Sequence, residues 1–160
     1  MVECTQKKKS GKCEMNVSHV YLDTSILIKR YVKEENSNLA DRYFYKAQRG
    51  EAVICLSEIN LGEAAVVFDQ YSMKTGIDAR KRLQAMLSEL ILLERSSSVE
   101  IYPVSSQIIR KAVETVLEQH LYIVDAIQLE TCIEAGKTVF CSADRVLNAA
   151  ARKLGIETAL

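Results

Sequence analysis

Four acidic residues stand where their side chains could share one chemistry: Asp23, Glu63, Asp125 and Asp144. Asp23 directly follows the apolar run 20–22, and Asp144 comes shortly after the apolar run 139–141. If both runs are strands of one parallel sheet, these two acids lie beyond the same edge, where such sheets bind ligands. Each has an alternative role as a helix N-cap, because Asp favours that position and both precede predicted helices.

Glu63 lies within a predicted helix over residues 57–73. Its neighbours three and four positions away include Ile59, Val66 and Val67, which predict an apolar face turned towards the interior. A glutamate on that face is costly unless it is paired or bound to a metal ion. Glu58 is the competing acid, but it sits at the helix start, where the helix dipole favours an exposed carboxylate.

Asp125 interrupts the apolar run 122–127. One interpretation is that it caps the next helix. If that helix packs against the sheet, the carboxylate instead faces inwards near the strand ends, beside the other acids.

A cluster of four carboxylates repels itself unless divalent cations neutralise it. Oxygen ligands without histidine or cysteine favour Mg²⁺ or Mn²⁺. Such ions activate water and stabilise the leaving oxygen, which suits hydrolysis of a phosphodiester. The sequence contains no GxxxxGK[ST], GxGxxG or GxSxG motif, and His19 and His120 have no evident catalytic partner.

Composition restricts the class of protein. The chain has 160 residues, enough for one domain, and its 21 basic and 21 acidic residues leave no net charge. Phosphate binding must therefore come from local patches. Five cysteines without a CxxC pair argue against a zinc site, and Cys55, Cys132 and Cys141 are expected in the core. With no apolar membrane span or signal peptide, we expect a cytoplasmic protein whose residues 1–18 form a flexible tail.

Short apolar runs alternate with longer helical patterns over residues 19–160. Strands are predicted at 20–22, 52–56, 99–102 and 137–141, with a candidate fifth at 156–159. Helices are predicted at 25–31, 37–48, 57–73, 78–95, 105–119, 124–135 and 145–154. Continuous β-branched strands separated by helices are typical of a parallel sheet covered on both faces. We predict an α/β domain: a three-layer α/β/α sandwich with a mostly parallel central sheet.

Four segments, each holding one of the acids, resemble the motifs of the PIN-domain family. Residues 20–27 form an apolar run ending in Asp-Thr, and residues 57–63 place a glutamate two turns after a serine. Residues 124–129 carry Asp-Ala before apolar residues, and residues 141–147 carry Ser-x-Asp after a strand. The resemblance covers residues 20 to about 159. It departs from the family at the unusual tail and at Ser142, where threonine is commoner.

The resemblance implies that Asp23, Glu63, Asp125 and Asp144 are catalytic and bind Mg²⁺ or Mn²⁺. It implies support from the hydroxyls of Thr24, Ser57 and Ser142, for which helix capping is the alternative role. Many compact members are VapC-type toxins, which cleave RNA, form dimers and are silenced by a VapB-type antitoxin. Other members process ribosomal RNA, and some have lost activity. We therefore predict a metal-dependent toxin endoribonuclease with an antitoxin partner; the alternatives are a ribosomal RNA processing enzyme and a catalytically silent binding module. A phosphatase or response-regulator-like domain would need acids clustered near the first strand, where only Asp23 is present.

Two further expectations concern the surface. Lys29 and Lys33, one turn apart on a predicted helix, and Arg145 flank the acids and are placed to bind RNA phosphates, although surface charges are ordinarily just solvated. The helices at 37–49 and 78–95 carry more large apolar residues than one sheet face absorbs, so we expect a homodimer built on some of Tyr43, Phe44, Tyr45, Leu87, Leu90, Ile91 and Leu92.

Overall fold

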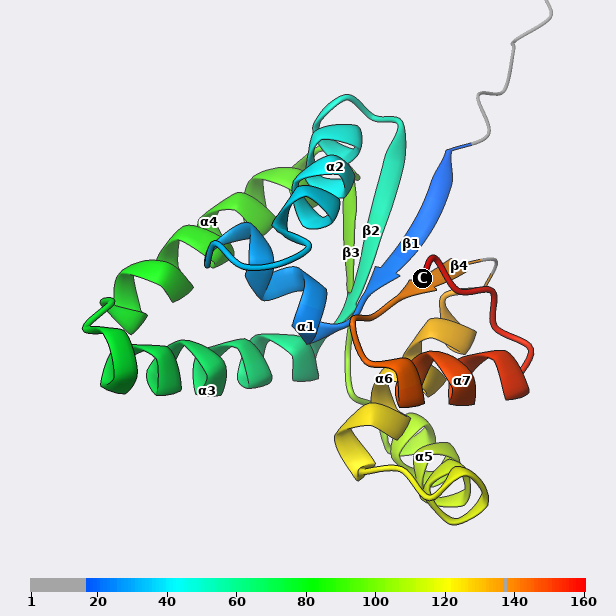
Figure 1. The fold of residues 1–160 in the computed structure, drawn as a ribbon. Coiled ribbons are helices and arrows are strands. Elements are labelled where there is room, and N and C mark those ends of the chain that lie inside the picture. Colours follow the sequence, from blue (N-terminus) through cyan, green and yellow to red (C-terminus); the bar gives the residue numbers. More distant parts are fainter. Residues whose placement is uncertain (1–16, 137) are drawn as a thin grey trace, which may run out of the picture.

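A parallel four-stranded sheet forms the centre of the protein (Figure 1). The structure is a computed structural model that describes residues 17–136 and 138–160. The strand order is β3-β2-β1-β4 and every pairing is parallel, so all carboxyl ends meet at one edge. The strands are β1 (Ser18–Leu22), β2 (Ala52–Ser57), β3 (Val99–Tyr102) and β4 (Thr138–Cys141).

Helices cover both faces of this sheet, which confirms the predicted α/β/α sandwich. The helices are α1 (Thr24–Leu27) continuing as η1 (Ile28–Arg30), α2 (Ser37–Gln48), α3 (Glu58–Thr75), α4 (Ala79–Arg95), α5 (Ser106–Gln119), α6 (Ile123–Glu134) and α7 (Arg145–Lys153). Figure 1 shows α1 to α4 on one side and α5 to α7 on the other. Because side chains alternate along a strand, Leu22 packs in the core beneath α2, α3 and α4, whereas Tyr21 packs in the core beneath α6 and α7.

The last predicted strand is absent among the described residues, where the segment after α7 makes only one isolated bridge. Gly155 adopts a left-handed conformation, with φ of 78°, and turns the chain back beside β4. There the Phe140 N–H donates to the Glu157 carbonyl, and the Ala159 N–H donates to the Phe140 carbonyl. The bridge pairs Phe140 with Thr158, so the prediction of a strand over 156–159 is wrong.

Helix starts also differ from the prediction by a residue or two. Ser57 ends β2 and caps α3, and Asp78 and Ser105 cap α4 and α5 rather than lying within them. Side-chain oxygens of such residues satisfy the backbone N–H groups that have no partner inside a helix. The helix predicted over 25–31 tightens into a 3₁₀ turn and ends at Arg30.

An ion-pair network fixes the chain that follows Asp23. The Arg30 guanidinium donates to Asp41 of α2 at 2.7 Å and to Glu89 of α4 at 2.9 Å. The Tyr31 hydroxyl donates to the same Glu89 carboxylate. Because Arg30 is largely shielded from water, these bonds tie α1 and η1 to both neighbouring helices and limit movement of the first acid.

Several sequence expectations concern the ends and the cysteines. Cys55, Cys132 and Cys141 are buried, as predicted, and burial raises the pKa of the Cys55 thiol to about 12. The predicted tail falls almost entirely outside the described residues, and β1 already begins at Ser18. Within residues 17–136 and 138–160, no helix is long and apolar enough to cross a membrane.

Candidate active site

Asp23 is held at the carboxyl end of β1 by two hydroxyl groups. Leu22 pairs with Cys141 across the sheet, which brings the next residues of both strands together. Asp23 Oδ2 accepts hydrogen bonds from Ser25 Oγ at 2.6 Å and from Ser142 Oγ at 2.8 Å. The carboxylate makes no capping bond, although the residue occupies the N-cap position of α1. The Asp23 side chain therefore does not act as a helix N-cap, which was the alternative role that the sequence allowed.

Asp144 does serve as a cap. Its Oδ1 accepts from the backbone N–H groups of Val146 and Leu147 at the start of α7. Ser142 connects it to the first acid, because the Ser142 hydroxyl accepts from the Asp144 N–H while donating to Asp23. Capping and participation in the site are compatible here, since Asp144 Oδ2 accepts no hydrogen bond from the described residues.

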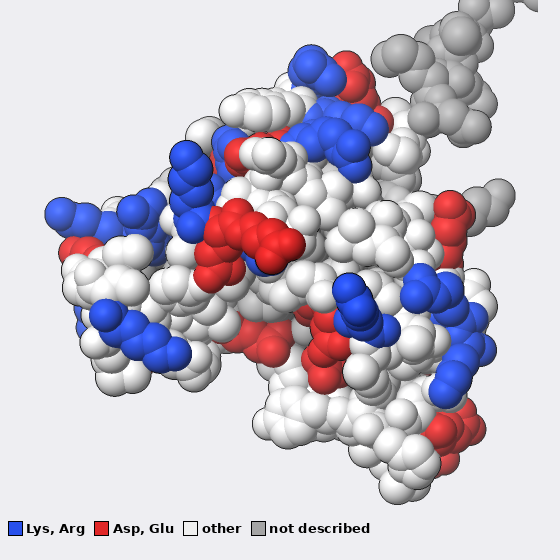
Figure 2. All heavy atoms as spheres, viewed as in Figure 1, with Lys and Arg blue, Asp and Glu red and all other residues white. Residues whose placement is uncertain are grey.

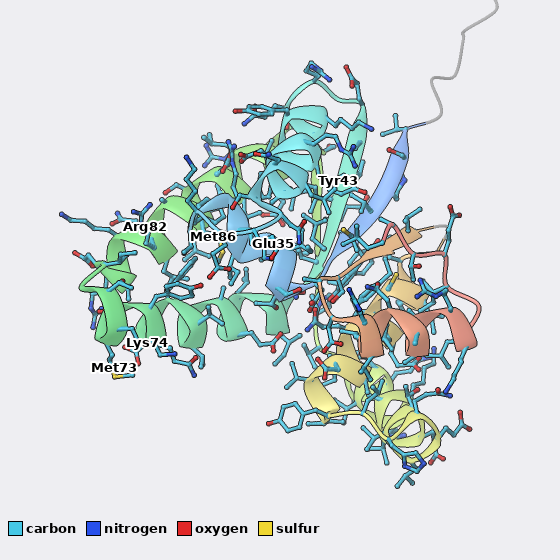
Figure 3. The ribbon with its side chains drawn as sticks, in the orientation of Figure 1. Glu35, Tyr43, Met73, Lys74, Arg82 and Met86 are labelled. Carbon is cyan, nitrogen blue, oxygen red and sulfur yellow. The ribbon has the colours of Figure 1, made fainter. Side chains whose placement is uncertain are left out.

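Glu63 points towards the strand ends from the first half of α3. Its Oε2 accepts from Thr24 Oγ1 at 2.7 Å and from Gln128 Nε2 at 2.8 Å. The expected apolar face is only partly right, because Val66 is 58% exposed. The second half of α3 extends away from the sheet as a hairpin with α4, and Figure 3 places Met73 and Lys74 at its far end. Only the first half of the helix can therefore contribute to the site.

Asp125 is the third residue of α6 and not its cap, since Tyr122 holds the N-cap position. The Asp125 carboxylate accepts no hydrogen bond from the part of the chain that the structure describes. Burial, followed by repulsion from Asp23 and Asp144, raises its pKa to about 6. Burial, followed by repulsion from Asp23 and Asp125, also raises the pKa of Glu63, against the lowering effect of the Thr24 hydrogen bond.

Repulsion thus links Glu63 to Asp23 and Asp125, and Asp125 to Asp23 and Asp144, beyond the sheet edge. Figure 2 shows acidic atoms in the hollow between α3 and the side formed by α6 and α7. Among residues 17–136 and 138–160, no three of the His, Cys, Asp and Glu side chains converge tightly enough to form a metal cage. Mutual repulsion, together with the separate hydrogen bonds of Asp23, Glu63 and Asp144, favours this spread.

The chemistry of these side chains still fits a hard divalent cation. Mg²⁺ and similar ions keep several waters and are bound by one or two carboxylates together with substrate phosphates. Three acids use a single oxygen for protein contacts, which leaves Asp23 Oδ1, Glu63 Oε1 and Asp144 Oδ2 without a donor in the described chain. None of these oxygens is a buried unpaired atom, so they face solvent and are available as ligands.

The supporting hydroxyls take different places. Thr24 bonds Glu63, and Ser142 bonds Asp23, as described above. Ser57 instead accepts from the Ile59 N–H and caps α3, the alternative role that its sequence context allowed. Glu58, the competing acid, is exposed and accepts from the Val104 N–H. It belongs to the helix start rather than to the acid cluster.

Two buried amides beside the site, Asn60 and Gln128, were not identified from the sequence. Asn60 Nδ2 donates to Gln128 Oε1 at 2.7 Å and to Thr24 Oγ1 at 2.8 Å. Asn60 is fully buried and Gln128 is 1% exposed. The available signal was an amide within an otherwise apolar stretch, because buried polar groups need partners.

The basic residues predicted to flank the acids are divided between two pockets that share Lys29. Lys29 and Arg145 line one pocket of about 610 Å³, together with Arg152 and Asn148. Lys29 also lines a second pocket, together with Lys33 and Arg82. The prediction that Lys29 and Lys33 share a helical face is wrong, because the 3₁₀ turn ends at Arg30 and Lys33 lies in the loop that follows.

The raised pKa of Asp125 predicts a pH-dependent gain in stability for Asp125→Asn. A carboxylate whose folded-state pKa is about 6, above its unfolded value, contributes stability below about pH 4 that is lost as the pH rises through 6. Asparagine removes that loss. Because Asp125 is half exposed, solvent screening reduces the free energy that the whole pKa shift would give. In EDTA we therefore expect the variant to be about 1 kcal/mol more stable than wild type at pH 7.5. The advantage should vanish near pH 4 in urea titrations, and an advantage independent of pH would contradict this origin.

Comparison with known proteins agrees with this fold. A family model described as the PIN domain matches residues 20–153, whereas no curated protein matches the sequence. PAE2754 from Pyrobaculum aerophilum has 15% identity and a TM-score of 0.61, with 90% of this chain and 91% of that chain covered. VapC20 from Mycobacterium tuberculosis, described as a sarcin-ricin loop cleaving toxin, has 17% identity and a TM-score of 0.60, with 82% and 94% covered. VapBC2 from Rickettsia felis, bound to a DNA fragment from their promoter, has 18% identity and a TM-score of 0.57, with 88% and 96% covered. At these identities the likeness is one of fold.

Proposed function

Because this chain belongs to the PIN-domain family, we propose that it is a metal-dependent endoribonuclease acting as the toxin of a toxin–antitoxin pair. One observation carries the proposal: acids from four separate elements meet beyond the carboxyl edge of the sheet, where Ser142 joins Asp23 to Asp144, and burial and repulsion raise the pKa of both Glu63 and Asp125. The four acids are Asp23, Glu63, Asp125 and Asp144. A structural role accounts for one oxygen of Asp144 and leaves the clustering of the other acids unexplained.

Mg²⁺ or Mn²⁺ held by these acids supplies the activation of a water molecule and the stabilisation of the leaving oxygen. The chain's own contribution is positional. Ser25 and Ser142 hold the first acid, and Thr24 holds Glu63. Lys29 and Arg145 bring positive charge to the pocket beside Ser142, where RNA phosphates next to the scissile bond would lie.

The direct test is RNA cleavage by the purified protein. Structured and unstructured RNAs are incubated with Mg²⁺ or Mn²⁺, with EDTA as the control. Cleavage that requires the ion is the expected result. A folded protein that binds RNA yet leaves it intact under every metal condition would instead support the silent binding module.

The toxin role extends to this chain what the description of VapC20 says of that protein. It requires a partner that silences the enzyme. A toxin expressed alone should arrest growth of the host cell. Co-expression with the product of a small neighbouring reading frame should restore that growth and abolish RNA cleavage. Cleavage confined to ribosomal RNA precursors, with no inhibitory partner, would favour the processing enzyme.

Phosphate binding by Lys29 and Arg145 is tested through the salt dependence of RNA affinity, with Ca²⁺ in place of the catalytic ion. Each lost phosphate contact should reduce the slope of log K against log salt by about 0.7 for single-stranded RNA. Lys29→Ala and Arg145→Ala should both flatten the slope. Lys33→Ala is the control, because Lys33 lines the second pocket and not the one that holds Arg145. An unchanged slope in both Lys29→Ala and Arg145→Ala would place the RNA elsewhere.

We also propose a homodimer through the face shared by α2 and α4. Of the residues predicted for this interface, Phe44 and Leu90 are core residues. Tyr45, Ile91 and Leu92 are 53%, 49% and 63% exposed. Light scattering at micromolar concentration should give twice the chain mass, and Leu92→Glu should halve it. Leu117→Glu, on the exposed side of α5, is the control, and a monomeric wild type would refute the proposal.

A further inference from the structure

A backbone N–H group sets which atoms donate and which accept in the buried hydrogen bonds that lead to Glu63. The Ser57 N–H can only donate, and it reaches Asn60 Oδ1 at 2.8 Å. The Tyr21 hydroxyl donates to the same oxygen at 2.8 Å. The Asn60 amide therefore has a single orientation, with its oxygen towards Ser57 and its NH₂ group towards the site.

That orientation determines the donors on Glu63. The two Asn60 Nδ2 hydrogens go to Thr24 Oγ1 and to Gln128 Oε1. Thr24 thereby accepts one bond and is left to donate its hydroxyl hydrogen to Glu63 Oε2. Gln128 accepts through its oxygen, so its NH₂ group faces Glu63 and donates to the same Oε2.

Both chains of hydrogen bonds thus end on one oxygen of one carboxylate. This fixes the rotation of the Glu63 carboxylate, with Oε2 bonded to the protein and Oε1 left accessible to solvent. We propose that Asn60 and Gln128 are positioning residues that present Glu63 Oε1 to the divalent cation. The inference rests on the proposed metal-dependent function.

A purely structural role explains these amides less well. Burying two amides is costly unless every hydrogen bond is made, and an apolar pair would avoid that cost. Asn60 uses both of its donors and accepts twice, so the network is complete at its buried end. A complete buried network rigidifies its members, and this one leads to the acid rather than closing on itself. The rigid amides therefore restrain the orientation of the Glu63 carboxylate.

Gln128→Met is the informative variant, because methionine keeps the length of the side chain and removes both polar atoms. Asn60 lies at the centre of the fold and is left intact. Thr131→Val is the matched control: Thr131 is buried on the same helix, and its hydroxyl donates only to the Ile127 carbonyl. Mutation of a residue that hydrogen-bonds a metal ligand typically weakens metal binding by about 10- to 100-fold. Calorimetric titration with Mn²⁺ should show at least about tenfold weaker binding for Gln128→Met and less than about twofold change for Thr131→Val.

A crystal structure of metal-free Gln128→Met gives a second readout that needs neither metal nor activity. The Glu63 carboxylate should rotate or become disordered, while Asn60 and Thr24 remain in place. Introducing Gln128→Met into Glu63→Gln should cause no further loss of Mn²⁺ affinity, because the oriented ligand is already gone. An unmoved carboxylate, or a wild-type Mn²⁺ affinity in Gln128→Met, would overturn the inference and leave the proposed function intact. A wild-type protein without Mn²⁺ affinity would overturn the proposed function, and the crystal structure would still decide whether Gln128 orients Glu63.

Discussion

Asp23→Asn is expected to lower the rate of RNA cleavage at least about a thousandfold, which corresponds to roughly 4 kcal/mol of transition-state stabilisation. The substitution removes the charge of the most enclosed acid in the cluster. The asparagine oxygen can still accept from Ser25 and Ser142, so the fold should survive. Initial rates in Mn²⁺, with circular dichroism to verify folding, measure the effect.

Glu58→Gln is the control for the loss of a carboxylate as such. Glu58 is exposed and contacts the Val104 N–H at the start of α3. Its replacement should leave the cleavage rate within about twofold of wild type. A near wild-type rate in Asp23→Asn would remove the acid cluster as the source of any nuclease activity.

Mn²⁺ is expected to raise the melting temperature of the wild type by about 5–10 °C at a hundredfold excess over its Kd. A ligand that binds only the folded state contributes about 2.7 kcal/mol at that excess. Each kcal/mol shifts the melting temperature of a chain of this size by about 2–4 °C. Relief of repulsion among the four carboxylates supplies the physical basis of this stabilisation.

Glu63→Gln should reduce this shift to less than about half. The amide can accept the bonds from Thr24 and Gln128 but offers the cation no charge. Differential scanning fluorimetry with and without Mn²⁺ makes the comparison, with Glu58→Gln again expected to behave as wild type. Equal shifts in Glu63→Gln and wild type would exclude Glu63 as a ligand.

The order of the elements, and the position of Asp23 and Asp144 just after two strands, followed from the sequence, because both are local properties. A continuous apolar strand between helices predicts a parallel sheet, and the residue after such a strand lies at its carboxyl edge. Asp23 and Asp144 could therefore be assigned to one edge from the sequence alone. The same reasoning could not separate capping from other roles, since an N-cap and a site residue occupy the same position. In the structure the two side chains differ in this role: Asp144 caps α7, whereas Asp23 makes no capping bond and accepts from two hydroxyl groups.

Contacts between distant residues were decided only by the tertiary structure. Asn60 and Gln128 are 68 positions apart, and Asp23 and Ser142 are 119 apart. No local pattern relates such pairs, because which side chains meet depends on how helices cross the sheet. For the same reason Val66 was expected in the core and is 58% exposed, whereas Phe68, further along the same helix, is 1% exposed: the buried stripe of α3 runs through Ala64 and Phe68. Periodicity indicates that a helix has a buried face, whereas which of its side chains lie on that face depends on the neighbours that the fold brings to it.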